Sequence, residues 1–243
     1  MSPPLIPANW QLPAYFRGRL GSTAGRQRTM VADGQLLIVA HQPPLADQVT
    51  RQAVLFWYDA RQWHASNGDP GSGAIGKLID AYVKRIDEFD RQEELAVRAQ
   101  DYLPLLDGLS PLMRAARNLY DVLQEARKAA PEIRELIDLR DRAYEMSRTA
   151  ELLYQDAKNA MDVAIVRRVE EQSQASHRMS VATHRLNLMV ALFFPLATLG
   201  SVLGTTLTEN WSWSQSAAPF LLFVLAGLIA GPLLALYVNR NSK

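Results

Sequence analysis

Residues 186–204 of the chain, LNLMVALFFPLATLGSVLG, form a run of 19 residues without a charged side chain. At about 1.5 Å per residue, a helix over this run is about 28 Å long, close to the thickness of the hydrocarbon core of a bilayer. A second uncharged run of 22 residues, AAPFLLFVLAGLIAGPLLALYV, covers 217–238. Little chain remains outside to bury both runs, so the sequence predicts transmembrane helices at 186–206 and 217–238.

Basic residues lie on only one side of this predicted pair. Arg185 precedes the first span, Arg240 and Lys243 lie in the tail 239–243, and the connecting loop 207–216 has no basic residue. Because basic residues concentrate in cytoplasmic segments, both termini are expected in the cytoplasm. The chain is therefore predicted to be a multi-pass protein of the plasma (inner) membrane.

The composition excludes several classes of function. With 26 Lys and Arg against 25 Asp and Glu in 243 residues, the net charge of +1 gives no argument for nucleic-acid binding. The absence of cysteine excludes disulfides, thiol nucleophiles and Cys-liganded zinc. The glycine-rich stretch 67–76 lacks the order of a phosphate-binding loop, because Leu78 follows Lys77 where a hydroxyl is needed. No catalytic residues can be assembled, so the chain is not expected to be an enzyme or to carry a cofactor.

Residues 1–75 predict a small α/β cytoplasmic domain. The β-rich runs QLLIVA at 35–40 and AVLFWY at 53–58 are expected to be strands, and 62–66 a further short one. Asp33-Gly34 is a turn signal.

Residues 76–130 predict an antiparallel pair of helices. Apolar residues recur at three- and four-residue steps from Ile75 to Phe89 and again from Leu112. Ser110 and Pro111 suggest the start of the second helix, as N-cap and first helical residue.

Residues 131–185 are expected to form a very long stalk helix continuous with the first transmembrane helix. No proline or glycine occurs between Pro131 and Pro195, and a helix over 131–204 has 74 residues and a length of about 110 Å. Residues at three- and four-residue steps form a seam typical of a coiled coil, which indicates that the helix packs against partners. The seam consists of Ile133, Leu136, Leu139, Ala143, Met146, Ala150, Leu153, Ala157, Ala160, Ala164 and Arg168.

This order of segments resembles the CorA family of divalent-cation channels over nearly the whole chain. The local match is best at 184–206, HRLNLMVALFFPLATLGSVLGTT, which is similar to the family's basic juxtamembrane turn, mid-span proline and span-ending glycine. The resemblance implies a CorA-like funnel, a homopentamer in the lipid bilayer whose first spans line a central pore. The transported ion it implies is a divalent cation, with Mg²⁺ first among them.

The polar side chains of the first span fall on one helix face. They belong to a series with steps of three and four residues: Asn187, Ala191, Phe194, Thr198, Ser201 and Thr205. In the ring that the resemblance implies, this face lines the pore, and Phe194 forms a hydrophobic constriction that gates by dewetting. A second interpretation stays open, in which the Ser and Thr hydroxyls bond to carbonyls of their own helix or allow close helix packing.

At the outer end, Gly204, Thr205 and Thr206 stand where CorA proteins carry Gly-Met-Asn. The resemblance implies that this is the outer selectivity position. Threonine hydroxyls there would contact the waters of a hydrated cation, because Mg²⁺ gives up its waters reluctantly. Glu209 would concentrate cations at the mouth, or is a solvated loop charge.

Two further alternatives stay open. The departure from Gly-Met-Asn favours a CorA-shaped membrane effector or scaffold that is unselective or does not conduct. His177 and His184 share a helix face and could bind zinc or respond to pH, or they are surface or packing histidines. The spacings Gly200-x-x-x-Gly204 and Gly227-x-x-x-Gly231 predict close packing of membrane helices.

Overall fold

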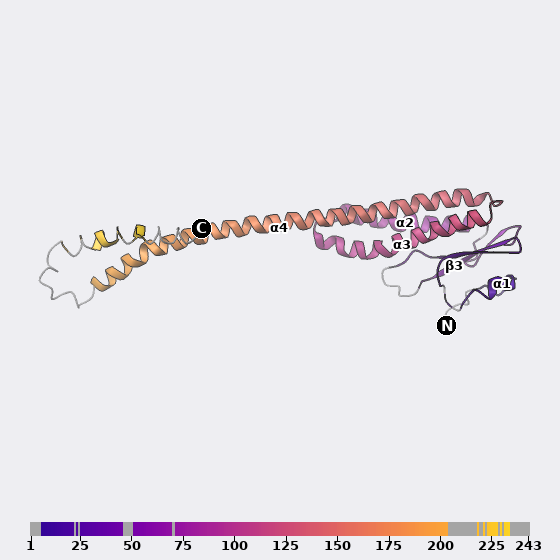
Figure 1. The fold of residues 1–243 in the computed structure, drawn as a ribbon, viewed down its shortest axis with the longest axis horizontal. Helices are drawn as coiled ribbons and strands as arrows, with labels where there is room; N and C mark the ends of the chain where they lie inside the picture. Colours follow the sequence, from indigo (N-terminus) through magenta and orange to yellow (C-terminus); the bar gives the residue numbers. More distant parts are fainter. Residues whose placement is uncertain are drawn as a thin grey trace. The chain divides into compact units, whose positions relative to one another are not determined.

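The computed structural model describes residues 6–21, 23, 25–45, 51–69, 71–203, 218, 221, 223–227, 229 and 231–233. Internal contacts divide the chain into two compact units, Met1–Val166 and Arg167–Lys243. The elements that carry labels in Figure 1 are α1 (Ala14–Arg17), β1 (Arg28–Ala32), β2 (Gln35–His41), β3 (Ala53–Tyr58), β4 (Trp63–Ala65), α2 (Gly73–Leu95), α3 (Ala99–Ala129) and α4 (Glu135–Leu203).

The four strands form one antiparallel sheet in the order β1-β2-β3-β4. The first hairpin turns at Asp33 and Gly34, whose φ angles of 52° and 70° give the two-residue turn that matches the twist of paired strands. Strands β2 and β3 occupy the two β-rich runs of the sequence, and β4 lies within 62–66. The sequence analysis did not predict strand β1. The Asp33-Gly34 hairpin turn before β2 indicates a strand on the N-terminal side of the turn, which is where β1 lies.

Both faces of the sheet are buried. Leu36 and Ile38 of β2 point to a core shared with the long helices, whereas Leu37 and Val39 point to a second, smaller core. The segment before β1 covers that second face with Trp10, Leu12 and Phe16, and Figure 1 shows α1 on the side of the sheet away from α3. Burial on both faces explains why β2 is a continuous apolar run without alternation.

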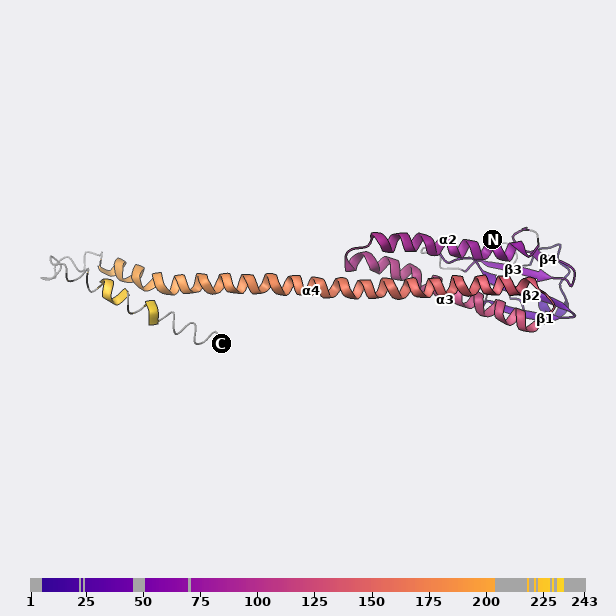
Figure 2. The ribbon, with the colours of Figure 1, turned by 90° about the horizontal axis from the view of Figure 1, so that it is seen from above.

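Helices α2, α3 and the first part of α4 lie side by side over the other face, as Figures 1 and 2 show. Arg142 of α4 forms an ion pair with Asp80 of α2 at 2.5 Å, and the rings of Tyr120 in α3 and Tyr144 in α4 lie 5.5 Å apart. The predicted seam of α4 faces this core, since its residues from Ile133 to Ala157 are buried and Ala160 and Ala164 are partly buried. The seam therefore packs on the chain's own α2 and α3.

The predicted start of the second helix at Ser110 and Pro111 is wrong. Helix α3 begins at Ala99, where the Asp101 carboxylate accepts hydrogen bonds from the backbone N–H groups of Arg98 (2.8 Å) and Val97 (3.3 Å). Pro104 and Pro111 lie inside the helix. Burial of the face that carries Leu105, Leu109 and Leu112 outweighs the local cost of a proline.

Helix α4 begins at Glu135, four residues after Pro131. A turn between Ala130 and Glu135 precedes it, with the Ile133 N–H donating to the Ala130 carbonyl at 3.2 Å. The 69 residues of α4 correspond to a length of about 100 Å.

Candidate functional site

The membrane-like part of the chain consists of the end of α4 and a shorter apolar helix that follows it. The described helix Glu135–Thr198 contains an 18-residue stretch that is apolar and long enough to cross a membrane. That stretch is not buried inside the protein. The shorter apolar helix lies at Phe223–Leu233, and Figures 1 and 2 show it running back alongside the end of α4. Length and composition favour a membrane location for the first of these two helices.

Two glycines mark where these helices pack. A Cβ atom at Gly227 would lie 2.3 Å from Cδ2 of Leu196, so a larger residue at 227 would require the Leu196 side chain to shift. A Cβ atom at Gly200 would lie 3.6 Å from the Phe223 ring, which is ordinary contact. Each pair joins α4 to the second helix, and the pairing is antiparallel because 196 and 200 meet 227 and 223. A close approach is therefore seen at Gly227 and not at Gly200, where the contact is an ordinary one.

The predicted pore face lies away from these contacts. At about 100° per residue, Thr198 is about 160° around the helix from both Leu196 and Gly200. Asn187, Thr198 and Ser201 are exposed. The contacts seen between the described residues of the two helices thus lie away from this face of α4.

Phe194 and Ala191 complete the described part of the face. Phe194 is 68% exposed, and Ala191 is half-buried. The Thr198 hydroxyl donates to the Phe194 carbonyl at 2.8 Å, as the second interpretation of these hydroxyls expects. Its oxygen keeps acceptor capacity, so the bond leaves it able to accept from the water of a hydrated cation.

Thr205, with Gly204, Thr206 and Glu209, lies outside the described residues. Of the two predicted histidines, His177 is exposed and His184 half-buried. Within the described ranges, no three His, Asp or Glu side chains come together in a way that could hold a metal ion. Zinc binding by these histidines stays a prediction without a completed ligand set.

From 165 to 183 every residue of α4 is exposed. The stretch includes large apolar side chains at Ile165, Val166 and Val169, which are between 43% and 65% exposed. Such a stretch gains nothing from tertiary packing within one chain, although packing supplies most of the stability of helices in proteins.

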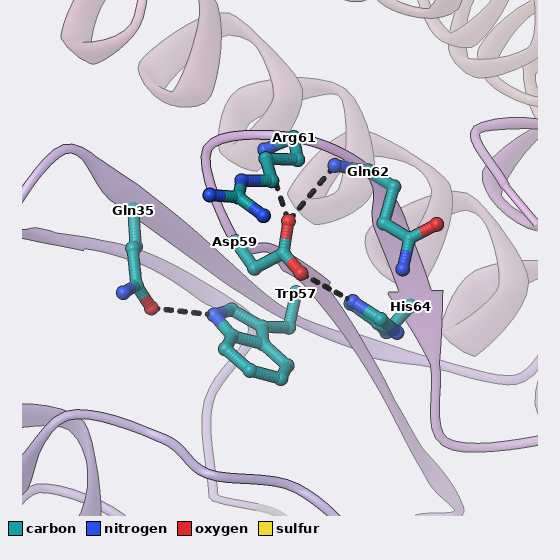
Figure 3. A network of polar contacts seen from close by, with 6 residues as sticks. All are labelled: Gln35, Trp57, Asp59, Arg61, Gln62 and His64. Carbon is teal, nitrogen blue, oxygen red and sulfur yellow. Dashed lines mark hydrogen bonds and ion pairs between the residues drawn. The ribbon is translucent and has the colours of Figure 1, made fainter.

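A polar network that the sequence did not predict holds the β3–β4 turn (Figure 3). The Asp59 carboxylate accepts from the backbone N–H groups of Arg61 (2.9 Å) and Gln62 (2.8 Å) and lies 2.8 Å from Nε2 of His64. The His64 ring stacks on Trp57 with 4.9 Å between centroids, and Trp57 Nε1 donates to the Gln35 amide oxygen at 2.9 Å. An aspartate followed by backbone donors two and three residues later was the signal in the sequence.

The network perturbs the pKa of Asp59. Partial burial acts to raise it, but the hydrogen bonds from His64, Gln62 and Arg61 outweigh burial and lower the pKa from 3.8 to about 2. Because each oxygen of the carboxylate is used within the turn, we assign this network a structural role.

Comparison with known proteins gives likenesses in structure only. The sequence matches no family model and no curated protein. The chain is similar to the CorA magnesium transporter from Methanocaldococcus jannaschii, with a TM-score of 0.48 and 12% identity over 90% of this chain and 80% of that one. It is also similar to the full-length CmaX protein, with a TM-score of 0.50 and 14% identity over 86% and 77% of the two chains. The likeness to CmaX shows a shared fold.

Replacement of Gly227 by alanine should destabilise the pair of apolar helices. The new Cβ would overlap Leu196, and overpacking of this kind typically costs about 1–3 kcal/mol. Gly200→Ala is the matched control, because its Cβ finds ordinary contact with Phe223. The measurement is the thermal unfolding temperature of the full chain in detergent. Equal effects of the two substitutions would contradict the packing described here.

Asp59→Asn should reduce stability and flatten its dependence on pH. The folded pKa of about 2 is below the unfolded value, so the stabilisation by Asp59 is full above about pH 4 and is lost as the pH falls toward 2. At pH 7 the substitution should cost about 1.5–3 kcal/mol, the range for hydrogen bonds to a charged group. Unfolding temperatures measured between pH 7 and 3 test this, with the exposed Asp90→Asn as control. A wild-type slope that persists in Asp59→Asn would refute it.

Proposed function

We propose that the chain is a subunit of a CorA-like, homo-oligomeric membrane channel for divalent cations, with Mg²⁺ as the favoured ion. The observation that carries the proposal is the free polar face of α4. Thr198 and Ser201 are exposed on a helix whose packing contacts, Leu196 and Gly200, lie elsewhere on its circumference. A polar side chain of a membrane helix has a high free energy when it faces lipid. We therefore expect water or protein beside this face of α4.

The proposed pore lining is Asn187, Ala191, Phe194, Thr198, Ser201 and Thr205. In a ring of copies, the Thr198 and Ser201 oxygens would contact the waters of a hydrated cation. Phe194 would supply a ring of apolar side chains that closes the path by excluding water. Its 68% exposure in the single chain fits a side chain whose neighbours are other copies.

Self-association is supported by the part of α4 that packs against no other described segment of the chain. Ile165, Val166 and Val169 are exposed on a helix that is solvated on all sides from 165 to 183. Packing of copies along this stretch would cover these side chains and hold the pore helices together. Five copies is the number that the CorA resemblance implies.

Conduction would be passive. An inside-negative potential favours entry of a cation by about 2.3 kcal/mol per charge per 100 mV, or about 4.6 kcal/mol for a divalent ion. In the proposed topology both termini are cytoplasmic, with spans at 186–206 and 217–238 and the loop 207–216 outside. Gly204, Thr205 and Thr206 would form the outer selectivity position, and Glu209 a ring of charge at the mouth.

Phe194→Gly should raise ion leak through the channel several-fold, because removal of the ring removes the barrier to hydration. The measurement is Mg²⁺ entry into liposomes that hold a Mg²⁺-sensitive dye, driven by an inside-negative potential, with protein-free liposomes for background. Phe193→Gly is the matched control, since Phe193 is 63% exposed one residue away, on another part of the helix surface. Equal leak through both variants would remove Phe194 as the gate.

A second candidate function is a CorA-shaped effector or scaffold that does not select Mg²⁺. It is favoured by Gly204-Thr205-Thr206 in place of Gly-Met-Asn. Thr206→Asn separates the candidates in the same liposome assay. We expect saturable Mg²⁺ entry through the wild type. A silent wild type with a conducting Thr206→Asn variant would support a pore with another role, and silence in both would support the scaffold.

A further inference from the structure

An apolar groove runs between α2 and the first part of α4, in the N-terminal unit and outside the proposed pore. It has a volume of about 450 Å³. Its apolar lining comes from both helices, with Ile79, Val83 and Ile86 on α2 and Met146 on α4. Figure 2 shows the two helices side by side on the outside of the helical layer. Val83 is 38% exposed, so the groove presents apolar surface to solvent and has room for a large side chain of a partner.

Carboxylates border this groove on both helices. Asp87 belongs to α2, while Asp141 and Glu145 belong to α4, and all three are exposed. Arg142 in the lining is already used in the ion pair with α2, and Asp141 is paired with Arg140 at 2.6 Å. Within the described residues, no ion pair holds Asp87 or Glu145. The groove therefore favours a partner that combines an apolar side chain with basic ones.

The segment around α1 carries such a combination. Tyr15 is 44% exposed, and the Arg19 guanidinium lies over its ring at 4.2 Å from the centroid. Arg17 is exposed beside them. The segment is held in place because Phe16 is fully buried in the second core. The first acidic residue of the chain is Asp33, so α1 presents an aromatic ring with two positive charges and no carboxylate of its own.

The groove and the α1 surface lie on opposite sides of the N-terminal unit. The order of the layers is α1, then the sheet, then the long helices, as Figure 1 shows. A contact between two different surfaces of identical copies is head-to-tail, and head-to-tail contacts form a closed ring when the rotation between copies allows it. A contact of one surface with itself would instead give a two-fold dimer. The two surfaces are thus placed as a ring of copies requires.

We propose that the groove between α2 and α4 of one copy receives Tyr15 of the neighbouring copy. Arg17 and Arg19 of that neighbour then lie beside the carboxylates of the groove. The inference rests on the homo-oligomer of the proposed function and names a contact that builds it. A tyrosine ring buries a large area at a low cost in conformational entropy, and its hydroxyl can stay in water at the rim. The arginines supply the positive charge that the unpaired Asp87 and Glu145 lack.

The test uses the absence of cysteine from the chain, because introduced thiols are then the only ones. The variant Ala14→Cys, Thr149→Cys places one thiol next to Tyr15 and one in the lining of the groove, both at exposed positions. In detergent, a short bis-maleimide should join the copies into a ladder of covalent oligomers. Each single variant should give no ladder, because a head-to-tail contact does not bring the same position of two copies together. The matched control is Ala14→Cys, Arg117→Cys, whose second thiol is exposed on α3 outside the groove.

Charge reversal in the same cysteine variant gives a second readout. Adding Asp87→Lys and Glu145→Lys should lower the yield of cross-linked oligomers by about fivefold or more, since like charges then face each other. Further addition of Arg17→Glu and Arg19→Glu should restore the yield. A purely structural role of these exposed residues within one copy would not produce this rescue.

Light scattering of the detergent-solubilised chain separates this proposal from that of the channel. An oligomer that gives no ladder overturns the contact between Tyr15 and the groove and leaves the proposed channel in place. A control variant that cross-links as strongly, or a charge reversal without rescue, overturns the contact in the same way. A monomer in light scattering overturns both the contact and the homo-oligomer on which it rests.

Discussion

The N-terminal unit depends on burial of one face of α4. Leu136, Ala143, Ala150 and Ala157 are fully buried along this face, and the small alanine side chains allow α2 and α3 to approach closely. Without this face of α4, the apolar side chains of α2 and α3 that now contact it would be exposed to solvent. The same helix leaves the core after Ala164, and from 165 to 183 every residue is exposed. A helix buried so unevenly along its length indicates two different environments.

In the second unit the packing face and the polar face are kept apart. Gly227 packs so closely on Leu196 that a Cβ atom at 227 would displace the leucine side chain, and the antiparallel pair forms through this side of α4. Thr198 lies nearly opposite, where its hydroxyl bonds to its own helix and remains exposed. The two roles of α4, packing against the second helix and lining a proposed multi-subunit pore, use different surfaces of the helix. A pore is therefore compatible with a stable hairpin.

The two polar clusters of the N-terminal unit differ in one respect that bears on their roles. Around Asp59 each carboxylate oxygen has a partner within the turn, and the lowered pKa is the expected consequence. Around His41 the backbone is satisfied and the Nε2 atom is not. The complete set of hydrogen-bond partners around Asp59 indicates a structural role. The incomplete set at the shielded Nε2 atom of His41 is a cost to stability within the core.

The sequence by itself determined the elements whose periodicity is strong, namely the strands at 35–40 and 53–58, the apolar seam of α4 and the close packing at Gly227. Local patterns failed where burial overrides them, as in α3, which runs through Pro111, and in β1, whose residues show no clear alternation. The candidate pore face could be predicted because all its residues lie on one helix with a fixed period. The groove between α2 and α4 could not, because Val83, Met146 and Thr149 come together only when α4 packs on α2. Tertiary structure alone decides which polar atoms find partners and which do not.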